Sequence, residues 1–147
     1  MLQMSWTEEY EVDGGVIDKE HQSLVEMANR VFQMASPEVE RSAMVEVVKA
    51  LFRYMEYHFK HEEELMIQCE YPGLVEHSQC HRRIVDEMTS SLRATKDIRQ
   101  YAVKLRNMMV DWVVAHMINE DKKIGAHIRK SHSTELSSVG ADCTGSA

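Results

Sequence analysis

Six polar side chains occupy positions where the helical periodicity of their neighbours predicts an apolar residue. They are His21, His58, Glu62, His77, His81 and His116. The residues three, four and seven positions away are mostly apolar, so a solvated helix face does not explain the six. A lone carboxylate such as Glu62 is costly to bury unless it is protonated or paired. A metal ion removes that cost, and we therefore expect a metal site inside the fold.

The spacing of these residues lets pairs of them reach one site. His58 and Glu62 are four positions apart, and so are His77 and His81. On a helix, partners at this spacing differ by roughly 40° in direction and lie about 6 Å apart along the axis. Each pair can therefore present two ligand atoms to one metal ion or to a pair of metal ions.

The sequence near residue 120 leaves one further ligand open. His116 and Asp121 are five positions apart, which separates them by roughly 140° on a regular α-helix. They can share a site only if the helix ends, kinks or widens between them. Periodicity alone therefore does not select Asp121.

The types of these side chains favour a pair of transition metals. Five imidazoles with one or two carboxylates form a nitrogen and oxygen set without thiolates, which disfavours structural zinc and iron–sulfur clusters. Calcium and magnesium prefer oxygen ligands alone, and five imidazoles exceed the needs of one tetrahedral zinc ion. The chain contains neither the Glu-x-x-His motif of carboxylate-rich di-iron bundles nor His-Glu-x-x-His of zinc peptidases. Iron is the natural candidate.

The elements that must position these residues are four amphipathic helices. Apolar stripes at helical spacing cover residues 17–35, 44–65, 74–92 and 98–116, after an irregular arm over residues 1–17. Asp18 is a plausible N-cap of the first helix, and Thr95 or Asp97 of the fourth. Pro37 is expected in the first turn of the second helix. Short connections predict an all-α, up-down-up-down antiparallel four-helix bundle with an N-terminal arm.

Composition indicates one soluble domain. The 147 residues carry a net charge of −7, which disfavours a nucleic-acid surface. No segment has the apolar length of a membrane helix, and the N-terminus does not resemble a signal peptide. The cysteines Cys69, Cys80 and Cys143 form no C-x-x-C pair, so we expect no disulfide framework and a cytoplasmic location. We expect the domain to cover residues 1–130 and a polar tail or linker without helical period to cover residues 131–147.

The candidate ligands stand within a series of short motifs. In chain order these are Trp6, Ile17-Asp18-x-x-His21, His58-Phe59-x-x-Glu62-Glu63, Tyr71-Pro72, His77-x-x-x-His81 and Trp112-x-x-x-His116-x-x-x-x-Asp121. In their order and spacing, these motifs resemble those of the bacterial hemerythrins, or bacteriohemerythrins, and the hemerythrin-like domains. The resemblance spans roughly residues 5–130.

The resemblance implies a role for each matching residue. One iron ion would take three imidazoles and the other two, with two carboxylates and an oxo or hydroxo group bridging the pair. The implied ligands are His77, His81 and His116 for the first iron, His21 and His58 for the second, and Glu62 and Asp121 as bridges. Dioxygen would bind at the open position of the second iron, beside pocket walls that we expect to include Phe59, Trp112 and Met117. The chain departs from the family pattern at Met117, often Ile, and at Ile124, often aromatic.

Three functions fit such a site. The first is reversible oxygen binding by a carrier or store, and the second is an oxygen or redox sensor joined by the tail to a signalling domain. The third is a di-iron enzyme, either oxidase- or peroxidase-like or active in iron-centre repair. The cysteine-containing N-terminal region usual in repair proteins is absent, so we expect an oxygen-binding or sensing protein and not an enzyme, with low-level oxidase activity left open. Other histidines, such as His61 and His127, are expected to be solvated.

Overall fold

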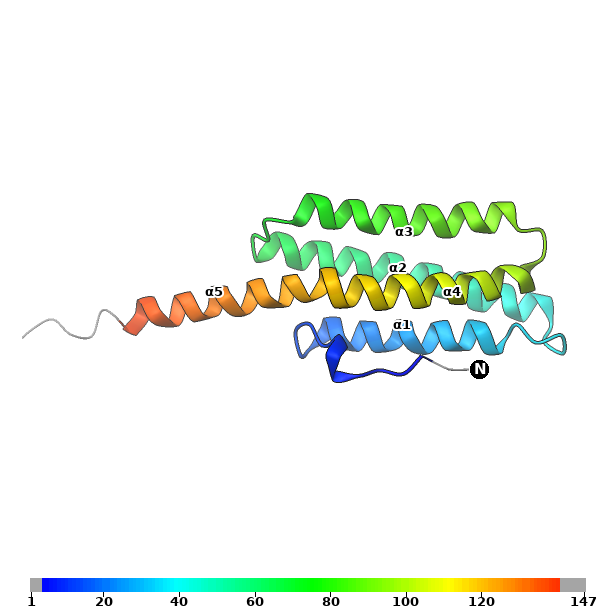
Figure 1. Ribbon diagram of the computed structural model, residues 1–147, viewed down its shortest axis with the longest axis horizontal. Helices are drawn as coiled ribbons and strands as arrows, with labels where there is room; N and C mark the ends of the chain where they lie inside the picture. The colour runs from blue at the N-terminus through cyan, green and yellow to red at the C-terminus, as the bar shows by residue number, and fades with distance from the viewer. Residues whose placement is uncertain (1–3, 141–147) are drawn as a thin grey trace, which may run out of the picture.

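The protein folds as an antiparallel bundle of four helices, seen in a computed structural model that describes residues 4–140 (Figure 1). The helices are α1 (Val16–Gln33), α2 (Arg41–Gln68), α3 (Leu74–Ala94) and α4 (Ile98–His116). No strand occurs among residues 4–140. The predicted all-α, up-down-up-down bundle is therefore confirmed.

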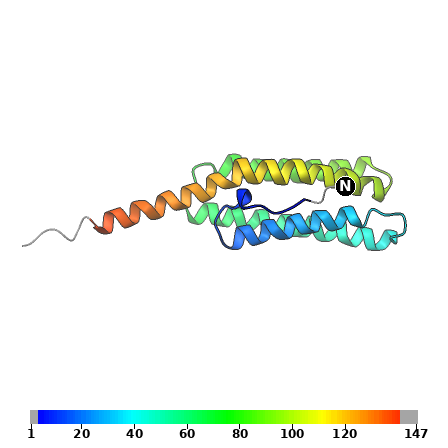
Figure 2. The ribbon, with the colours of Figure 1, turned by 60° about the horizontal axis from the view of Figure 1, so that its bottom comes forward.

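The helical chain of α4 continues past the end of the bundle. α4 passes through a π-helical turn, η2 (Met117–Asp121), into α5 (Lys122–Gly140). α5 projects past the end of the bundle, as both ribbon views show (Figures 1 and 2). Before α1, the N-terminal arm forms a short 3-10 turn, η1 (Glu8–Tyr10), and runs back beside α1.

The topology brings four helix ends to the same side of the bundle. The start of α1, the end of α2, the start of α3 and the end of α4 all lie at the end from which α5 projects (Figure 1). Side chains near those four ends can therefore meet, although they are up to a hundred positions apart in the sequence. The rest of the interior is apolar. Its fully buried members include Ala28, Met44, Leu51, Tyr101, Ala102, Leu105 and Met109.

Two aspartates organise the start of α1, and the predicted one, Asp18, does not act as its cap. The carboxylate of Asp13 accepts hydrogen bonds from the backbone N–H groups of Gly15, Ile17 and Asp18 at 2.9, 3.1 and 3.2 Å. Asp18 lies inside α1, so its prediction as the N-cap is wrong. Its buried carboxylate instead accepts bonds from the arm.

The arm turns back through these contacts with Asp18. Val12 N–H donates to Oδ1 of Asp18 at 2.7 Å, and Gly14 N–H donates to Oδ2 at 2.6 Å. Gly14 has a φ of 66°, a conformation that glycine adopts without steric cost. Hydrogen bonds from backbone N–H groups of the arm to the Asp18 carboxylate therefore hold the arm against α1.

The starts of α2 and α4 differ in how well they were predicted. Pro37 lies in the loop before α2, which begins only at Arg41, because a turn closed by the bond from Val39 N–H to Ser36 O occupies that segment. The prediction of a first-turn proline is therefore wrong. Asp97 accepts a hydrogen bond from Arg99 N–H at 2.9 Å, which confirms it as a cap of α4.

The helical structure continues further than the sequence pattern indicated. No helical period is visible from residue 131 onward, yet α5 runs to Gly140. A period in apolar residues reports burial and not helicity, and this part of α5 lies outside the bundle (Figure 2). Residues 141–147, including Cys143, lie outside the described residues. Among the described residues, Cys69 and Cys80 are free thiols, and no helix is long and apolar enough to cross a membrane.

Candidate metal centre

The structure brings all seven predicted ligand residues together at the α5 end of the bundle. They form two groups in which the ligand atoms lie within 4.8 Å of one another. One group is Glu62, His77, His81, His116 and Asp121, and the other is His21, His58, Glu62 and Asp121. Glu62 and Asp121 belong to both groups, so the two carboxylates lie between three imidazoles on one side and two on the other.

Glu62 lies at the centre of this cluster. Its side chain is fully buried, with 0% exposure. Oε1 lies 3.1 Å from Nε2 of His21 and 3.0 Å from Nε2 of His58. Oε2 lies 3.4 Å from Nε2 of His77 and 3.1 Å from Nε2 of His81. Each oxygen thus faces one of the two groups of imidazoles, which is the geometry that a bridging carboxylate requires.

The π-helical turn brings Asp121 into the same cluster. A π-helix bonds residue i to residue i+5, so side chains five positions apart lie on one face. Asp121 Oδ1 accordingly lies 3.0 Å from Nε2 of both His116 and His77, and Oδ2 lies 3.1 Å from Nε2 of His21. Of the three possibilities that the sequence left open between His116 and Asp121, an end, a kink or a widening of the helix, the structure shows the widening. This departure explains why a regular period missed Asp121.

Several buried atoms of the cluster have short contacts without hydrogen-bond geometry. Nε2 of His81, Nε2 of His116 and Oδ1 of Asp121 are buried and have no hydrogen-bond partner among the described residues. Such atoms are rare in folded proteins, because an unmade buried hydrogen bond costs about 1–3 kcal/mol. Metal ions at the centre would accept these lone pairs, so the donor set fits a metal pair.

The pKa values of His58, His77, Glu62 and Asp121 are shifted by their neighbours in the cluster. Burial opposes the charge on His58 and His77, but nearby carboxylates outweigh it, and they raise the pKa of His58 to about 10 and that of His77 to about 9. Burial likewise opposes ionisation of Glu62 and Asp121, but the surrounding imidazoles lower the pKa of both carboxyl groups. Without metal, the cluster therefore holds protons that metal ions must displace.

A comparison with known proteins agrees with this geometry. The family model described as the hemerythrin HHE cation binding domain matches residues 15–128. The chain belongs to the hemerythrin family.

Curated members of the hemerythrin family resemble the chain over most of its length. A protein named bacteriohemerythrin from Stenotrophomonas maltophilia is 28% identical over 137 residues, which cover 88% of this chain and 87% of that protein. A bacteriohemerythrin from Pseudomonas aeruginosa is 29% identical, covering 90% and 86% of the two chains, and one from Clostridium acetobutylicum is 25% identical, covering 80% and 95%. All seven clustered residues lie inside the region that the hemerythrin model matches.

A small cavity lies beside the two-imidazole group of this hemerythrin domain. It has a volume of about 20 Å³, and Phe59, Trp112 and Met117, the three expected pocket walls, all line it. His21, His58 and Asp121 also line the cavity, as does His116 of the three-imidazole group, whereas His77 and His81 do not. The remaining wall is mostly apolar and includes Leu24, Met55 and Ile84. A space of this size admits about one water-sized molecule.

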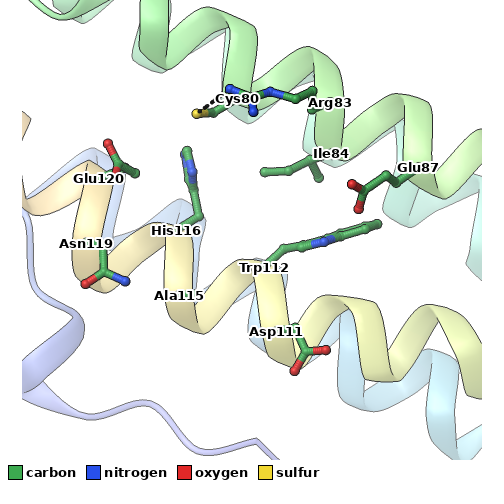
Figure 3. A pocket seen from close by; sticks show the side chains of 10 residues that line it. All are labelled: Cys80, Arg83, Ile84, Glu87, Asp111, Trp112, Ala115, His116, Asn119 and Glu120. Atoms are coloured by element: carbon green, nitrogen blue, oxygen red, sulfur yellow. Dashed lines mark hydrogen bonds between the residues drawn. The ribbon is translucent and has the colours of Figure 1, made fainter.

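A groove of about 310 Å³ between α3 and α4 reaches the same region from the surface (Figure 3). His116 and Trp112 extend from α4 toward α3, and together with Ile84 of α3 they line both the groove and the inner cavity (Figure 3). The side chain of His116 is 10% exposed, whereas that of Asp121 is 1% exposed. The side chains of Ile84, Trp112 and His116 therefore form the wall between solvent and the cavity.

Sequence reasoning missed a second ring of polar contacts around this hemerythrin cluster. Glu20 is 5% exposed and lies on α1, where it contacts His58 and His61 of α2. Hydrogen bonds to these two histidines outweigh the burial that opposes ionisation, and the pKa of Glu20 is lowered. The signal was available, because Glu20 is three positions after Ile17 and four before Leu24, at the edge of the apolar stripe of α1.

Two histidines that we expected to be solvated have partners in the structure. The side chain of His61 is 34% exposed, and its Nδ1 lies 2.6 Å from Oε1 of Glu20. His127 is half-buried, and its Nε2 donates to the backbone carbonyl of Cys69 at 2.8 Å. The expectation is wrong for His127, whereas His61 is partly exposed and also has a carboxylate partner. Contacts between helices, which a single period does not report, decide the surroundings of both rings.

Proposed function

We propose that this protein binds dioxygen reversibly at two iron ions held by the seven clustered side chains. His77, His81 and His116 would hold one iron, His21 and His58 the other, and Glu62 and Asp121 would bridge them beside an oxo or hydroxo group. When bound, the ferrous ions would supply the electrons that dioxygen takes up. Family membership and the unsatisfied buried atoms described above support this assignment.

The observation that carries the proposal is the unequal division of the imidazoles. Two carboxylates are common to both groups, but one group has three imidazoles and the other has two. A metal held by this second group would have one nitrogen donor fewer, which would leave room for an external ligand. The inner cavity is lined by both imidazoles of this group and by only His116 of the other group, which supports binding of an external ligand on this side.

The size and lining of the cavity favour a diatomic ligand over an organic substrate. Its volume of about 20 Å³ accommodates dioxygen but not a molecule with several carbon atoms. Phe59 and Met117 present apolar surface to this space, and Phe59 also stacks on His81 with ring centroids 3.9 Å apart. These residues would exclude water and hold the imidazole in place. The proposal is therefore binding of dioxygen and not oxidation of a substrate.

Anaerobic loading with ferrous iron tests this function. Metal analysis should find about two irons per chain, and admission of air should produce a visible charge-transfer spectrum that disappears when dioxygen is removed. Protein that stays free of iron would refute the metal site. Loaded protein whose spectrum never reverses, while an added organic reductant is consumed catalytically, would favour the enzyme alternative.

A second candidate is an oxygen or redox sensor that signals through a C-terminal domain. The observation that favours it is the continuous helix from α4 to α5, which carries both His116 and Asp121 and then projects beyond the bundle (Figure 1). Hydrogen exchange of amides 122–134 should then differ between the ferrous protein without and with dioxygen. Identical exchange would leave the carrier or storage role as the proposal.

A further inference from the structure

The imidazoles of the cluster differ in what holds the ring nitrogen that faces away from the site. Nδ1 of His58 lies 3.0 Å from Oε2 of Glu20, whose side chain is 6% exposed. Nδ1 of His81 lies 3.3 Å from Glu63, whose side chain is 38% exposed. Nδ1 of His21 and Nδ1 of His77 are buried and have no hydrogen-bond partner among the described residues. His58 is thus the cluster imidazole with a buried carboxylate behind it.

Glu20 is itself held from the other side. Its Oε1 lies 2.6 Å from Nδ1 of His61, which is one helical turn after His58 on α2. The two oxygens of one carboxylate from α1 therefore contact two imidazoles from α2. This double contact orients the carboxylate, and both partners of the contact between Glu20 and His58 are buried.

A carboxylate in this position has two chemical effects on an imidazole. It accepts the Nδ1–H bond, which fixes the tautomer and leaves the Nε2 lone pair pointing at the centre, 3.0 Å from Glu62. It also makes the imidazole a stronger donor, because negative charge behind the ring increases the basicity of Nε2. A stronger donor stabilises the higher oxidation state of a bound metal.

We propose that Glu20 is a positioning residue that orients His58 and strengthens its donation to the metal with two imidazoles. The inference rests on the proposed function, since it assigns His58 to that metal. The stronger donation from His58 would therefore act on the metal that would have fewer nitrogen donors, on the side of the cavity. His61 supports Glu20 and does not touch the centre.

The test compares Glu20→Ala and Glu20→Gln with wild type and with the control Glu26→Gln, an exposed carboxylate on the same helix. Anaerobic competition with a chelator measures ferrous affinity, and spectroelectrochemistry measures the reduction potential of the loaded centre. Glu20→Ala should weaken the affinity for one of the two irons about 10- to 100-fold. Glu20→Gln retains an oxygen that accepts the His58 N–H, so it should recover most of that affinity but show a more positive potential.

The outcomes separate this inference from the function on which it rests. Wild-type protein that binds no iron overturns both. Wild-type protein that loads normally, with Glu20 variants unchanged in affinity and potential, overturns the role of Glu20 alone. A Glu20→Gln variant with wild-type potential also overturns it, because a merely structural contact would leave the potential unmoved. If Glu20→Ala does not fold, the potential of Glu20→Gln decides.

Discussion

Replacing Glu62 by glutamine removes one negative charge from the centre of the cluster and leaves its shape nearly unchanged. The Glu62 carboxylate is fully buried and lies 3.0–3.4 Å from four imidazole nitrogens. Removing one partner of a buried charged network costs about 3–5 kcal/mol. A chain of 147 residues has an unfolding entropy of about 0.3 kcal/mol/K, so the metal-free Tm should fall by about 10–16 °C.

Thermal unfolding of the metal-free protein, followed by circular dichroism, measures this loss. Glu64→Gln is the matched control, because Glu64 is an exposed carboxylate two positions away on α2. Its effect should stay within about 0.5 kcal/mol, or about 2 °C. In the iron-loaded protein, Glu62→Gln should also bind less iron, since a bridging ligand is lost.

Two results would refute this reasoning. Equal Tm losses in Glu62→Gln and Glu64→Gln would mean that the buried charge of Glu62 does not stabilise the metal-free protein through the surrounding imidazoles. A Glu62→Gln protein that retains both irons and the wild-type spectrum would remove Glu62 from the set of bridging ligands.

Three further predictions concern the arm, the cavity wall and pH. Gly125→Ala would place a Cβ 2.1 Å from the Val12 carbonyl oxygen, so it should displace the arm, cost about 1–3 kcal/mol in urea unfolding and speed proteolysis before α1. Trp112→Ala should open the wall between groove and cavity. Stopped-flow spectroscopy of the iron-loaded protein should then find faster dioxygen exchange than in wild type, and unchanged rates would count against a role of Trp112 as a barrier. The raised folded-state pKa values of His58 and His77 stabilise the metal-free protein below about pH 6.5, and this stability should disappear as pH rises through about 9 and 10. Urea midpoints that do not fall over this range would contradict the assigned charges.

The architecture and most of the candidate site could be predicted from sequence because burial has a local signature. Apolar residues at helical spacing mark the buried face of each helix, and an antiparallel order of four such helices follows from short connections. His58 and Glu62 were identifiable because polar residues on those faces require a special explanation. The types of these ligands then favoured iron over zinc, calcium and magnesium.

Features that depend on a departure from the regular helix were decided by the tertiary structure. Asp121 reaches the cluster only because η2 widens the helix after His116. The tertiary structure also decided which aspartate caps α1. Asp13 accepts hydrogen bonds from the first amides of α1, whereas Asp18 accepts them from the arm. A local pattern cannot distinguish these outcomes, because the competing backbone donors lie within a few residues of each other.

By itself, the sequence determined which faces are buried and which side chains on them need partners. It could not determine which atoms meet across helices, because that depends on the rotation and register of each helix against its neighbour. Only packing α1 against α2 brought Glu20 between His58 and His61. The structure likewise decided the helical state of residues 131–140, which continue α5 past the end of the bundle (Figure 1) where the sequence has no apolar period to indicate a helix.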